Sequence, residues 1–138
     1  MREQYQLLVY TDGASRGNPG PSAIGYSIYD PEGELVEQDA RTIGTHTNNE
    51  AEYQALLWAI ERAKVHARGP VKFHSDSELM VHQVNGVYKA SNERMRRLLE
   101  TVRQQIGAFE GFRIVYVPRE TPRIQVVDGL VNEALDNG

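Results

Sequence analysis

The sequence contains no cysteine, so disulfide bonds, zinc–thiolate sites and cysteine nucleophiles are all excluded. It has no apolar run long enough to cross a bilayer, and its first residues, MREQYQ, are polar rather than signal-like. We therefore expect a cytoplasmic protein that does not bind membranes. An excess of basic residues is also missing. The formal net charge of −4 has the wrong sign for a broad nucleic-acid-binding surface, unless several acids are gathered in one metal site.

One domain over residues 1–138 is expected, because a chain of 138 residues is long enough for one core and too short for two. No linker, internal repeat or low-complexity tract divides it. The sequence does not determine the oligomeric state, and a monomer is the expectation.

Hydrophobic periodicity separates the strands from the helices. The run Leu7–Val9 is apolar on both faces, as in a central strand, whereas residues 56–63 carry apolar side chains at helical spacing. Thr47 and Glu50 fit a capping box that starts this helix, which ends before Gly69-Pro70. Strands are expected at residues 5–11, 23–30, 34–43, 71–76 and 112–118. Helices are expected between residues 47 and 69 and at 77–86, 92–109 and 124–136.

The order of these elements predicts an α/β fold. Three consecutive strands joined by short turns form an antiparallel meander. A right-handed crossover through the first helix then places strand 71–76 parallel to strand 5–11 and beside it. The result is a five-stranded mixed sheet, part antiparallel and part parallel, flanked by helices.

Four acids occupy positions where an acid is unusual. Asp12 and Asp76 each follow an apolar strand, at the edge of the sheet where ligands bind in open α/β folds. Glu52 heads the buried face of the first long helix, and Asp128 shares a face with apolar residues of the last helix. Asp136 is a nearby acid that can be confused with Asp128, but it lies close to the end of the chain.

Each acid also has an ordinary structural explanation. Asp12 can be a turn residue before a glycine, and Asp76 can cap the helix that follows it. Glu52 can be the N3 partner of an Asn49 cap, and Asp128 can be a first-turn acid. Together, however, four carboxylates at one end of one sheet repel each other unless cations bind them. All-oxygen ligands favour Mg²⁺ or Mn²⁺, and two such ions can catalyse phosphodiester hydrolysis.

Four segments in order resemble type 1 ribonuclease H: TDGASRGNPGPSAIGY, TNNEAEYQALLWAI, HSDSELMVHQVNG and VPRE followed by VVDGLVNEAL. The resemblance covers nearly the whole chain. It implies a ribonuclease H-like fold and endonucleolytic hydrolysis of RNA in RNA–DNA hybrids by two metal ions, with 5′-phosphate and 3′-hydroxyl products. The implied metal-binding and catalytic residues are Asp12, Glu52, Asp76 and Asp128. The implied substrate contacts are Gly13, Ser15, Arg16, Asn18, Thr47, Asn48 and Asn49, with Gly13, Gly17 and Gly20 keeping the hairpin thin.

The sequence departs from the family in two places. Many relatives have a histidine on the loop before the last acid, and here that loop has none; Arg119, Glu120 and Arg123 are the candidate substitutes. The segment after the second helix is too short for the basic protrusion of some relatives, and no N-terminal hybrid-binding module is expected. The basic residues of the segment after the second helix form either a modest substrate-binding patch or a solvated helix face. These residues are Lys89, Arg94, Arg96 and Arg97.

Two other functions are compatible with this pattern. A DEDD-type 3′–5′ exonuclease shares the fold and the metals, but usually opens with Asp-x-Glu, whereas Gly13-Ala14 follow Asp12 here. A catalytically silent nucleic-acid-binding module, or a purely structural adaptor, would have no use for the acids. A phosphate-binding P-loop is excluded because GASRGNPGP has no Gly-Lys-Ser/Thr ending.

Overall fold

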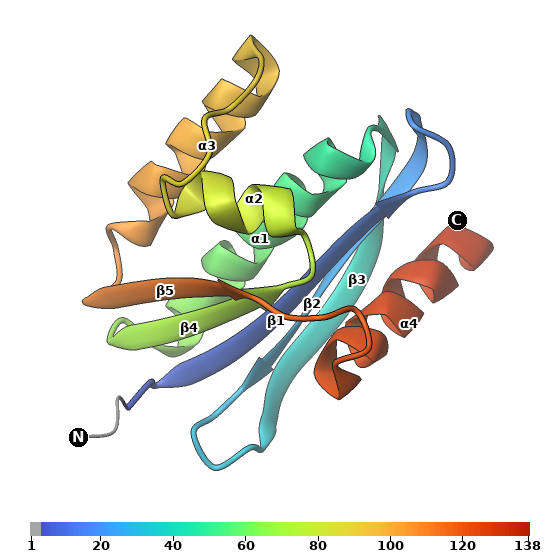
Figure 1. The fold of residues 1–138 in the computed structure, drawn as a ribbon. Helices are drawn as coiled ribbons and strands as arrows, with labels where there is room; N and C mark the ends of the chain where they lie inside the picture. The colour runs from blue at the N-terminus through green and yellow to red at the C-terminus, as the bar shows by residue number, and fades with distance from the viewer. Residues whose placement is uncertain (1–3) are drawn as a thin grey trace.

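The sheet is built around strand β1 (Leu7–Ser15), whose apolar residues pack under helices on both of its faces (Figure 1). The computed structural model describes residues 4–138. The strand order is β3-β2-β1-β4-β5, with β1, β2 and β3 antiparallel and β4 and β5 parallel to β1. The predicted mixed sheet and the predicted position of β4 beside β1 are therefore confirmed. The other strands are β2 (Gly20–Tyr29), β3 (Leu35–His46), β4 (Pro70–Ser75) and β5 (Gly111–Tyr116).

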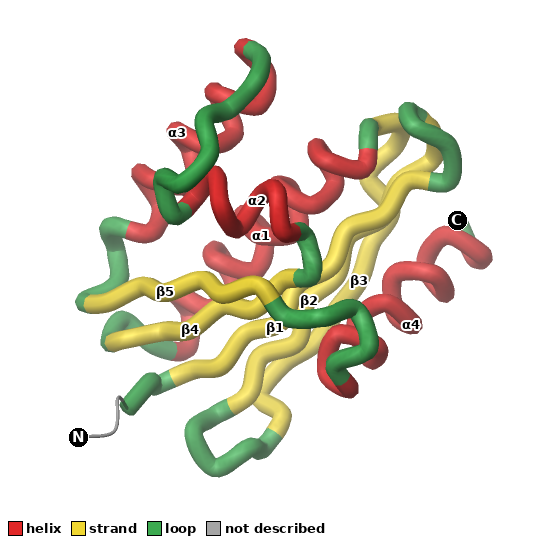
Figure 2. The backbone as a smooth tube through the Cα atoms, in the orientation of Figure 1, coloured by secondary structure: helices red, strands yellow, loops and turns green. Residues whose placement is uncertain are grey.

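Helices cover the two faces of the sheet unequally. Helix α1 (Asn48–His66) packs on β1 and β2, and α3 (Glu93–Ile106) packs on α1, with the short α2 (Glu78–Val84) near β5 (Figure 2). Helix α4 (Pro122–Asn137) covers the opposite face alone, over β1, β2 and β3. The main core lies between α1 and the sheet, and a smaller core lies under α4. No helix within residues 4–138 is both long and apolar enough to cross a membrane.

Strand β1 is longer than the sequence predicts. It was expected to end at residue 11, and β2 to begin at residue 23. Instead the two strands stay paired from Leu8↔Tyr29 to Ser15↔Ser22. The small residues Gly13, Ala14 and Ser15 lack the strand propensity that marks a strand in a sequence, yet they continue the ladder because β2 offers them a partner. Asp12 therefore lies within β1 rather than at its end.

The helix starts follow the capping rules. The capping box of Thr47 and Glu50 is present: the Glu50 amide donates to Thr47 Oγ1 at 3.2 Å, and the Thr47 amide donates to Glu50 Oε1 at 2.9 Å. Ser77 caps α2 and Asn92 caps α3. Helix α4 has a proline in its first turn and no side-chain cap.

Glu37 anchors the edge strand β3 to α1, and removing it should destabilise the protein. Its carboxylate accepts two hydrogen bonds from Arg62 at 2.6 and 2.9 Å, one from His66 at 2.8 Å, and one from the buried hydroxyl of Tyr26. The Arg62 hydrogen bonds, joined by those of Tyr26 and His66, lower the pKa of Glu37 to about 2. We expect Glu37→Ala to lower the free energy of unfolding, measured in urea, by about 2–3 kcal/mol. The charged hydrogen bonds are lost, and the buried Tyr26 hydroxyl is left without this partner.

The exposed Glu34 provides the matched control for this measurement, and Glu34→Ala should leave the free energy of unfolding nearly unchanged. Equal unfolding midpoints for the two variants would show that Glu37 does not anchor β3.

Candidate metal centre

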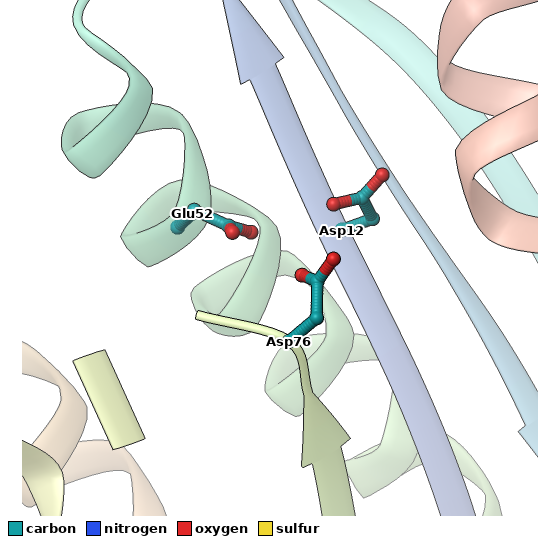
Figure 3. Close-up of side chains that lie close together, drawn as sticks. All are labelled: Asp12, Glu52 and Asp76. Carbon is teal, nitrogen blue, oxygen red and sulfur yellow. The ribbon is translucent and has the colours of Figure 1, made fainter. Parts of the chain in front are cut away.

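Three of the four predicted acids meet at one point. Asp12 from β1, Glu52 from α1 and Asp76 from the residue after β4 each offer a carboxylate oxygen, and these oxygens lie within 4.8 Å of one another (Figure 3). Asp12 is buried, and the other two are half-buried. These acids lie far apart in the sequence, so only the tertiary fold brings them together.

The early end of β4 creates this site. Strand β4 stops at Ser75, while β1 continues to Ser15, which leaves an open edge of β1 beside Asp12. Glu52 reaches this edge and accepts a hydrogen bond from the Gly13 amide at 2.9 Å. A Cβ atom on Gly13 would lie 2.3 Å from the carbonyl oxygen of Ala51, so glycine is required for α1 to approach β1 this closely. This close approach of α1 is a second reason for a glycine at position 13, and the predicted contact of Gly13 with a nucleic acid stays a prediction.

The three carboxyls destabilise one another's charged forms. Burial raises the pKa of Asp12 to about 8, and the charges of Asp76 and Asp128 and a side-chain hydrogen bond with Asp128 add to this effect. Burial, followed by the charges of Asp12 and Asp76, also holds the pKa of Glu52 well above its usual range. Burial raises the pKa of Asp76 as well, against the opposing charge of Arg119. Such a site favours either protons or bound cations.

Asp128 approaches this cluster from the opposite layer. It lies on α4, and its carboxyl is close enough to Asp12 to contribute to the raised pKa of Asp12. One carboxylate oxygen lies 3.9 Å from the guanidinium of Arg119, and the other accepts a hydrogen bond from Asn132 at 3.3 Å. Asp128 is not among the three residues whose oxygens meet within 4.8 Å. Asp136, the acid that was open to confusion with it, instead pairs with Arg16 at 2.7 Å.

The ordinary explanations for the four acids are wrong in each case. Asp12 lies in a strand and not in a turn. Glu50, not Glu52, is the N3 partner, and Thr47 rather than Asn49 is the cap. Ser77 takes the capping role considered for Asp76. Helix α4 has no acid in its first turn, so Asp128 does not serve there.

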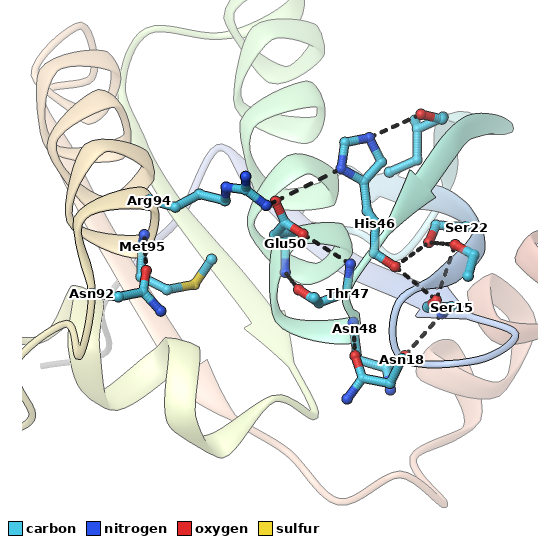
Figure 4. Close-up of polar contacts among 12 residues, drawn as sticks. Ser15, Asn18, Ser22, His46, Thr47, Asn48, Glu50, Asn92, Arg94 and Met95 are labelled. Atoms are coloured by element: carbon cyan, nitrogen blue, oxygen red, sulfur yellow. Dashed lines mark hydrogen bonds and ion pairs between the residues drawn. The ribbon is translucent and has the colours of Figure 1, made fainter.

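Three of the seven predicted substrate residues, Ser15, Asn18 and Asn48, join the β1–β2 loop to the start of α1 (Figure 4). The Ser15 amide donates to Asn48 Oδ1 at 2.8 Å, and the Asn48 amide donates to Asn18 Oδ1 at 3.1 Å. The Ser15 hydroxyl also donates to the carbonyl of His46 at 2.8 Å. Asn49 is exposed in the first turn of α1. The loop and the helix start therefore form one surface, and their predicted contact with substrate stays a prediction.

Arg16 differs from the other predicted substrate residues. Its guanidinium points to α4, where it pairs with Asp136 and donates to the carbonyl and side-chain oxygens of Asn132 at 3.3 and 3.5 Å. No local sequence pattern reveals these partners, because they lie more than a hundred positions further along the chain.

A pocket of about 310 Å³ escaped the sequence analysis. It lies between the starts of α1 and α3 and is lined by Thr47, Glu50, Asn92, Arg94 and Met95 (Figure 4). Arg94 pairs with Glu50 there at 3.0 Å. Asn92 comes directly before the acidic first turn of α3, which is a recognisable pattern for a helix cap. The sequence alone does not show that this cap lies beside the start of α1.

Comparison with known proteins assigns the chain. A family model described as reverse transcriptase-like matches residues 10–134. The chain belongs to this reverse transcriptase-like family. Within the family it is similar to ribonuclease HI of Halobacterium salinarum, with 39% identity over 132 residues, 96% of this chain and 65% of that relative. The resemblance to type 1 ribonuclease H is therefore confirmed.

Solved structures of type 1 ribonucleases H match the fold. The crystal structure of RNase H1 from Halobacterium salinarum has a TM-score of 0.90 and 38% identity, covering 96% of this chain and 98% of that one. LC11-RNase H1, solved in complex with an RNA/DNA hybrid, has a TM-score of 0.89 and 35% identity, covering 95% of this chain and 97% of that one. The predicted ribonuclease H-like fold is confirmed.

Some curated relatives of this reverse transcriptase-like chain are longer than the region that matches. A bifunctional protein of Mycobacterium tuberculosis is 30% identical over 132 residues, which is 95% of this chain but 36% of that relative. The match thus spans about two thirds of the Halobacterium protein and about a third of the mycobacterial one.

Proposed function

We propose that this protein is an endoribonuclease that hydrolyses the RNA strand of RNA–DNA hybrids with two divalent metal ions. The observation that carries the proposal is the meeting of Asp12, Glu52 and Asp76 at the end of β4, with Asp128 facing them from α4. The similarity to ribonuclease HI along nearly the whole chain supports the same reaction. The hybrid bound in the LC11-RNase H1 crystal structure supports the substrate.

The residues present fit a pair of Mg²⁺ or Mn²⁺ ions. Burial, followed by the charges of Asp76 and Asp128, raises the pKa of Asp12, which a bound cation would oppose. All the donors are oxygens, which these hard ions prefer. Asp12 is central, since it neighbours both Asp76 and Asp128, and it would contribute to both metal positions. Bound ions would make water a better nucleophile and neutralise charge on the leaving oxygen.

The reaction is a hydrolysis across one phosphodiester bond. Water oxygen bonds to phosphorus, the bond from phosphorus to the 3′ oxygen breaks, and that oxygen leaves with a proton. The products carry a 5′-phosphate and a 3′-hydroxyl. The chain's part is to hold four carboxylates in place, as the Gly13 amide does when it orients Glu52.

The surface beside the acids suits a hybrid. The loop residues Ser15 and Asn18 and the residues at the start of α1 carry small amides and hydroxyls, of the kind that fit a minor groove and recognise 2′-hydroxyls. The residues at the start of α1 are Thr47, Asn48 and Asn49, and Arg16 adds a positive charge to the loop. The pocket beside Asn92 and Arg94 offers donors for a backbone phosphate. Arg96 and Arg97 both pair with Glu93, which reduces the basic patch expected on α3. We expect weak binding that falls steeply with salt.

A substrate panel separates this function from its alternatives. The panel contains an internally labelled RNA–DNA hybrid with a blocked RNA 3′ end, the same RNA single-stranded, and an RNA duplex. An endonuclease specific for hybrids cuts only the first, at internal positions. A DEDD-type exonuclease would leave the blocked strand intact, and a silent binding module would bind the hybrid without cutting it.

Arg119 is the best placed substitute for the missing loop histidine. It lies 3.9 Å from Asp128, and its charge lowers the pKa of Asp12, Glu52 and Asp76, in each case against larger raising effects. Arg123 instead stacks 3.9 Å above the Tyr29 ring. We expect Arg119→Ala to lower kcat about tenfold with little change in KM, a size typical of residues that support metal ligands. Steady-state cleavage kinetics test this.

Arg96→Ala is the control for Arg119→Ala, because Arg96 pairs only locally, with Glu93. Its kcat should stay within about twofold of wild type, as for most surface substitutions. An unchanged kcat in Arg119→Ala would remove Arg119 from the reaction.

A further inference from the structure

Asp128 is held by a side chain that no part of the reaction described above requires. Asn132 lies one helical turn after Asp128 on α4, and its side-chain amide nitrogen donates to the Asp128 carbonyl at 3.0 Å and to the Asp128 carboxylate at 3.3 Å. The other Asp128 oxygen faces Arg119. One Asp128 carboxylate oxygen thus faces Arg119 and the other faces Asn132, and of these two residues Asn132 lies on the same helix as Asp128.

Arg16 and the Asp128 carboxylate favour the same orientation of the Asn132 amide. A guanidinium can only donate hydrogen bonds, and that of Arg16 lies 3.5 Å from Asn132 Oδ1. The amide oxygen must therefore face Arg16, and the amide nitrogen is left for Asp128. Asp136, one further turn along α4, holds the same guanidinium nitrogen at 2.7 Å. The three α4 residues form a row spaced four apart, which places them on one helix face.

We propose that Asn132 is a positioning residue for Asp128, and that Arg16 acts on Asp128 through Asn132. This inference rests on the proposed function, since Asp128 must be a metal ligand for its orientation to matter. It gives Arg16 a role other than the substrate contact expected from the sequence. It also connects the β1–β2 loop, which lies in the proposed substrate surface, to a metal ligand on the opposite face of the sheet.

The first arm of the test measures Mn²⁺ binding to the metal-free protein by electron paramagnetic resonance, without substrate. Asp128→Asn defines the part of the binding that depends on Asp128. Asn132→Ala should raise the Kd of that part about tenfold, the lower end of the effect of groups that orient metal ligands. Asn137→Ala, the same change at an exposed position of α4, should leave it within twofold. Asn132→Leu, which keeps the length and branching of the side chain without its polar atoms, replaces Asn132→Ala if the latter does not fold.

The second arm asks whether Arg16 works through Asn132. Arg16→Ala should weaken Mn²⁺ binding about threefold in the wild type and have no further effect in Asn132→Ala, because coupled residues give non-additive changes. The Mg²⁺ concentration for half-maximal hybrid cleavage should rise in the same way, less in Arg16→Ala than in Asn132→Ala. At saturating Mg²⁺, both variants should recover most of the wild-type kcat.

The possible outcomes test the roles of Asn132, Arg16 and Asp128 separately from the proposed function. Unchanged Mn²⁺ binding in Asn132→Ala, with weakened binding in Asp128→Asn, would overturn the role of Asn132. Equal effects of Arg16→Ala in both backgrounds would overturn the role of Arg16. Unchanged Mn²⁺ binding in Asp128→Asn would overturn the inference at its first step. Absence of cleavage by the wild type would overturn the proposed function, and the Mn²⁺ titrations would still decide the inference.

Discussion

Replacing Asp12 with Asn should abolish hybrid cleavage and at the same time stabilise the metal-free protein. The loss of activity follows because Asp12 is the acid that neighbours both Asp76 and Asp128; we expect kcat to fall about 1,000-fold or more. The gain in stability follows because Asp12 is only 6% exposed and its pKa is raised to about 8. A neutral amide does not have to take up a proton on folding, so the free energy of unfolding in EDTA at pH 7 should rise by about 1–3 kcal/mol, several degrees in Tm.

Asp39→Asn is the matched control for this experiment. Asp39 is exposed on the edge strand β3, and the same change there should alter neither cleavage nor the Tm in EDTA by more than the error of measurement. If Asp12→Asn lowered the Tm in EDTA, Asp12 would be a stabilising residue and the electrostatic description of the site would be wrong.

The metal-free protein should lose stability as the pH rises from 7 to 8.5, and Mg²⁺ should reverse that loss. The pKa of Asp12 is raised in the folded state, to about 8 from 3.8, so the native protein holds a proton there that the unfolded chain has already released. Stability from this group is therefore full below pH 3.8 and is lost as the pH passes 8. The slope is about 1.4 kcal/mol per bound proton and pH unit, which gives about 1 kcal/mol over this interval.

The interval from pH 7 to 8.5 avoids the titration of two other groups with shifted pKa values, His74 and Glu37. Burial lowers the pKa of His74 to about 4, so it adds stability with rising pH only up to its ordinary value of 6.5. The pKa of Glu37 is lowered to about 2, and its contribution is lost only in acid. Above pH 7 the acidic cluster therefore remains as the source of the slope.

Thermal unfolding at pH 7 and 8.5, in EDTA and in excess Mg²⁺, measures this effect. The gain in Tm from Mg²⁺ should be larger at pH 8.5, because the ion competes with protons for the carboxylates. In Asp12→Asn the fall in EDTA should be much smaller. A Tm in EDTA that rises with pH in the wild type would contradict the raised pKa of Asp12.

The sequence predicts the frame of the site well because that frame depends on general rules. The right-handed crossover correctly places β4 beside β1, so Asp12 and Asp76 were expected to be neighbours. The buried face of α1 correctly points Glu52 toward the sheet. These inferences need only hydrophobic periodicity and chain order, both of which are visible in one sequence.

The details that the sequence did not reveal depend on partners distant in the chain. Asp12 was expected at the end of a strand, but β1 continues because β2 pairs with Gly13–Ser15. The missing side chain of Gly13 also admits the backbone of α1, and Arg16 also pairs with Asp136. No local pattern encodes these contacts, because each joins residues that only the tertiary fold brings together. The predicted contacts of Gly13 and Arg16 with the substrate stay predictions.

The measurement that tests the central claim most directly is cleavage of a labelled RNA–DNA hybrid by EDTA-treated protein, before and after adding Mg²⁺ or Mn²⁺, beside the same RNA alone. We predict no cleavage in EDTA, internal cleavage of the hybrid after either ion is added, 5′-phosphate and 3′-hydroxyl ends, and no cleavage of the single strand. A folded protein that binds the hybrid and leaves it intact with both ions would contradict a catalytic role for Asp12, Glu52 and Asp76 and would favour a silent binding module.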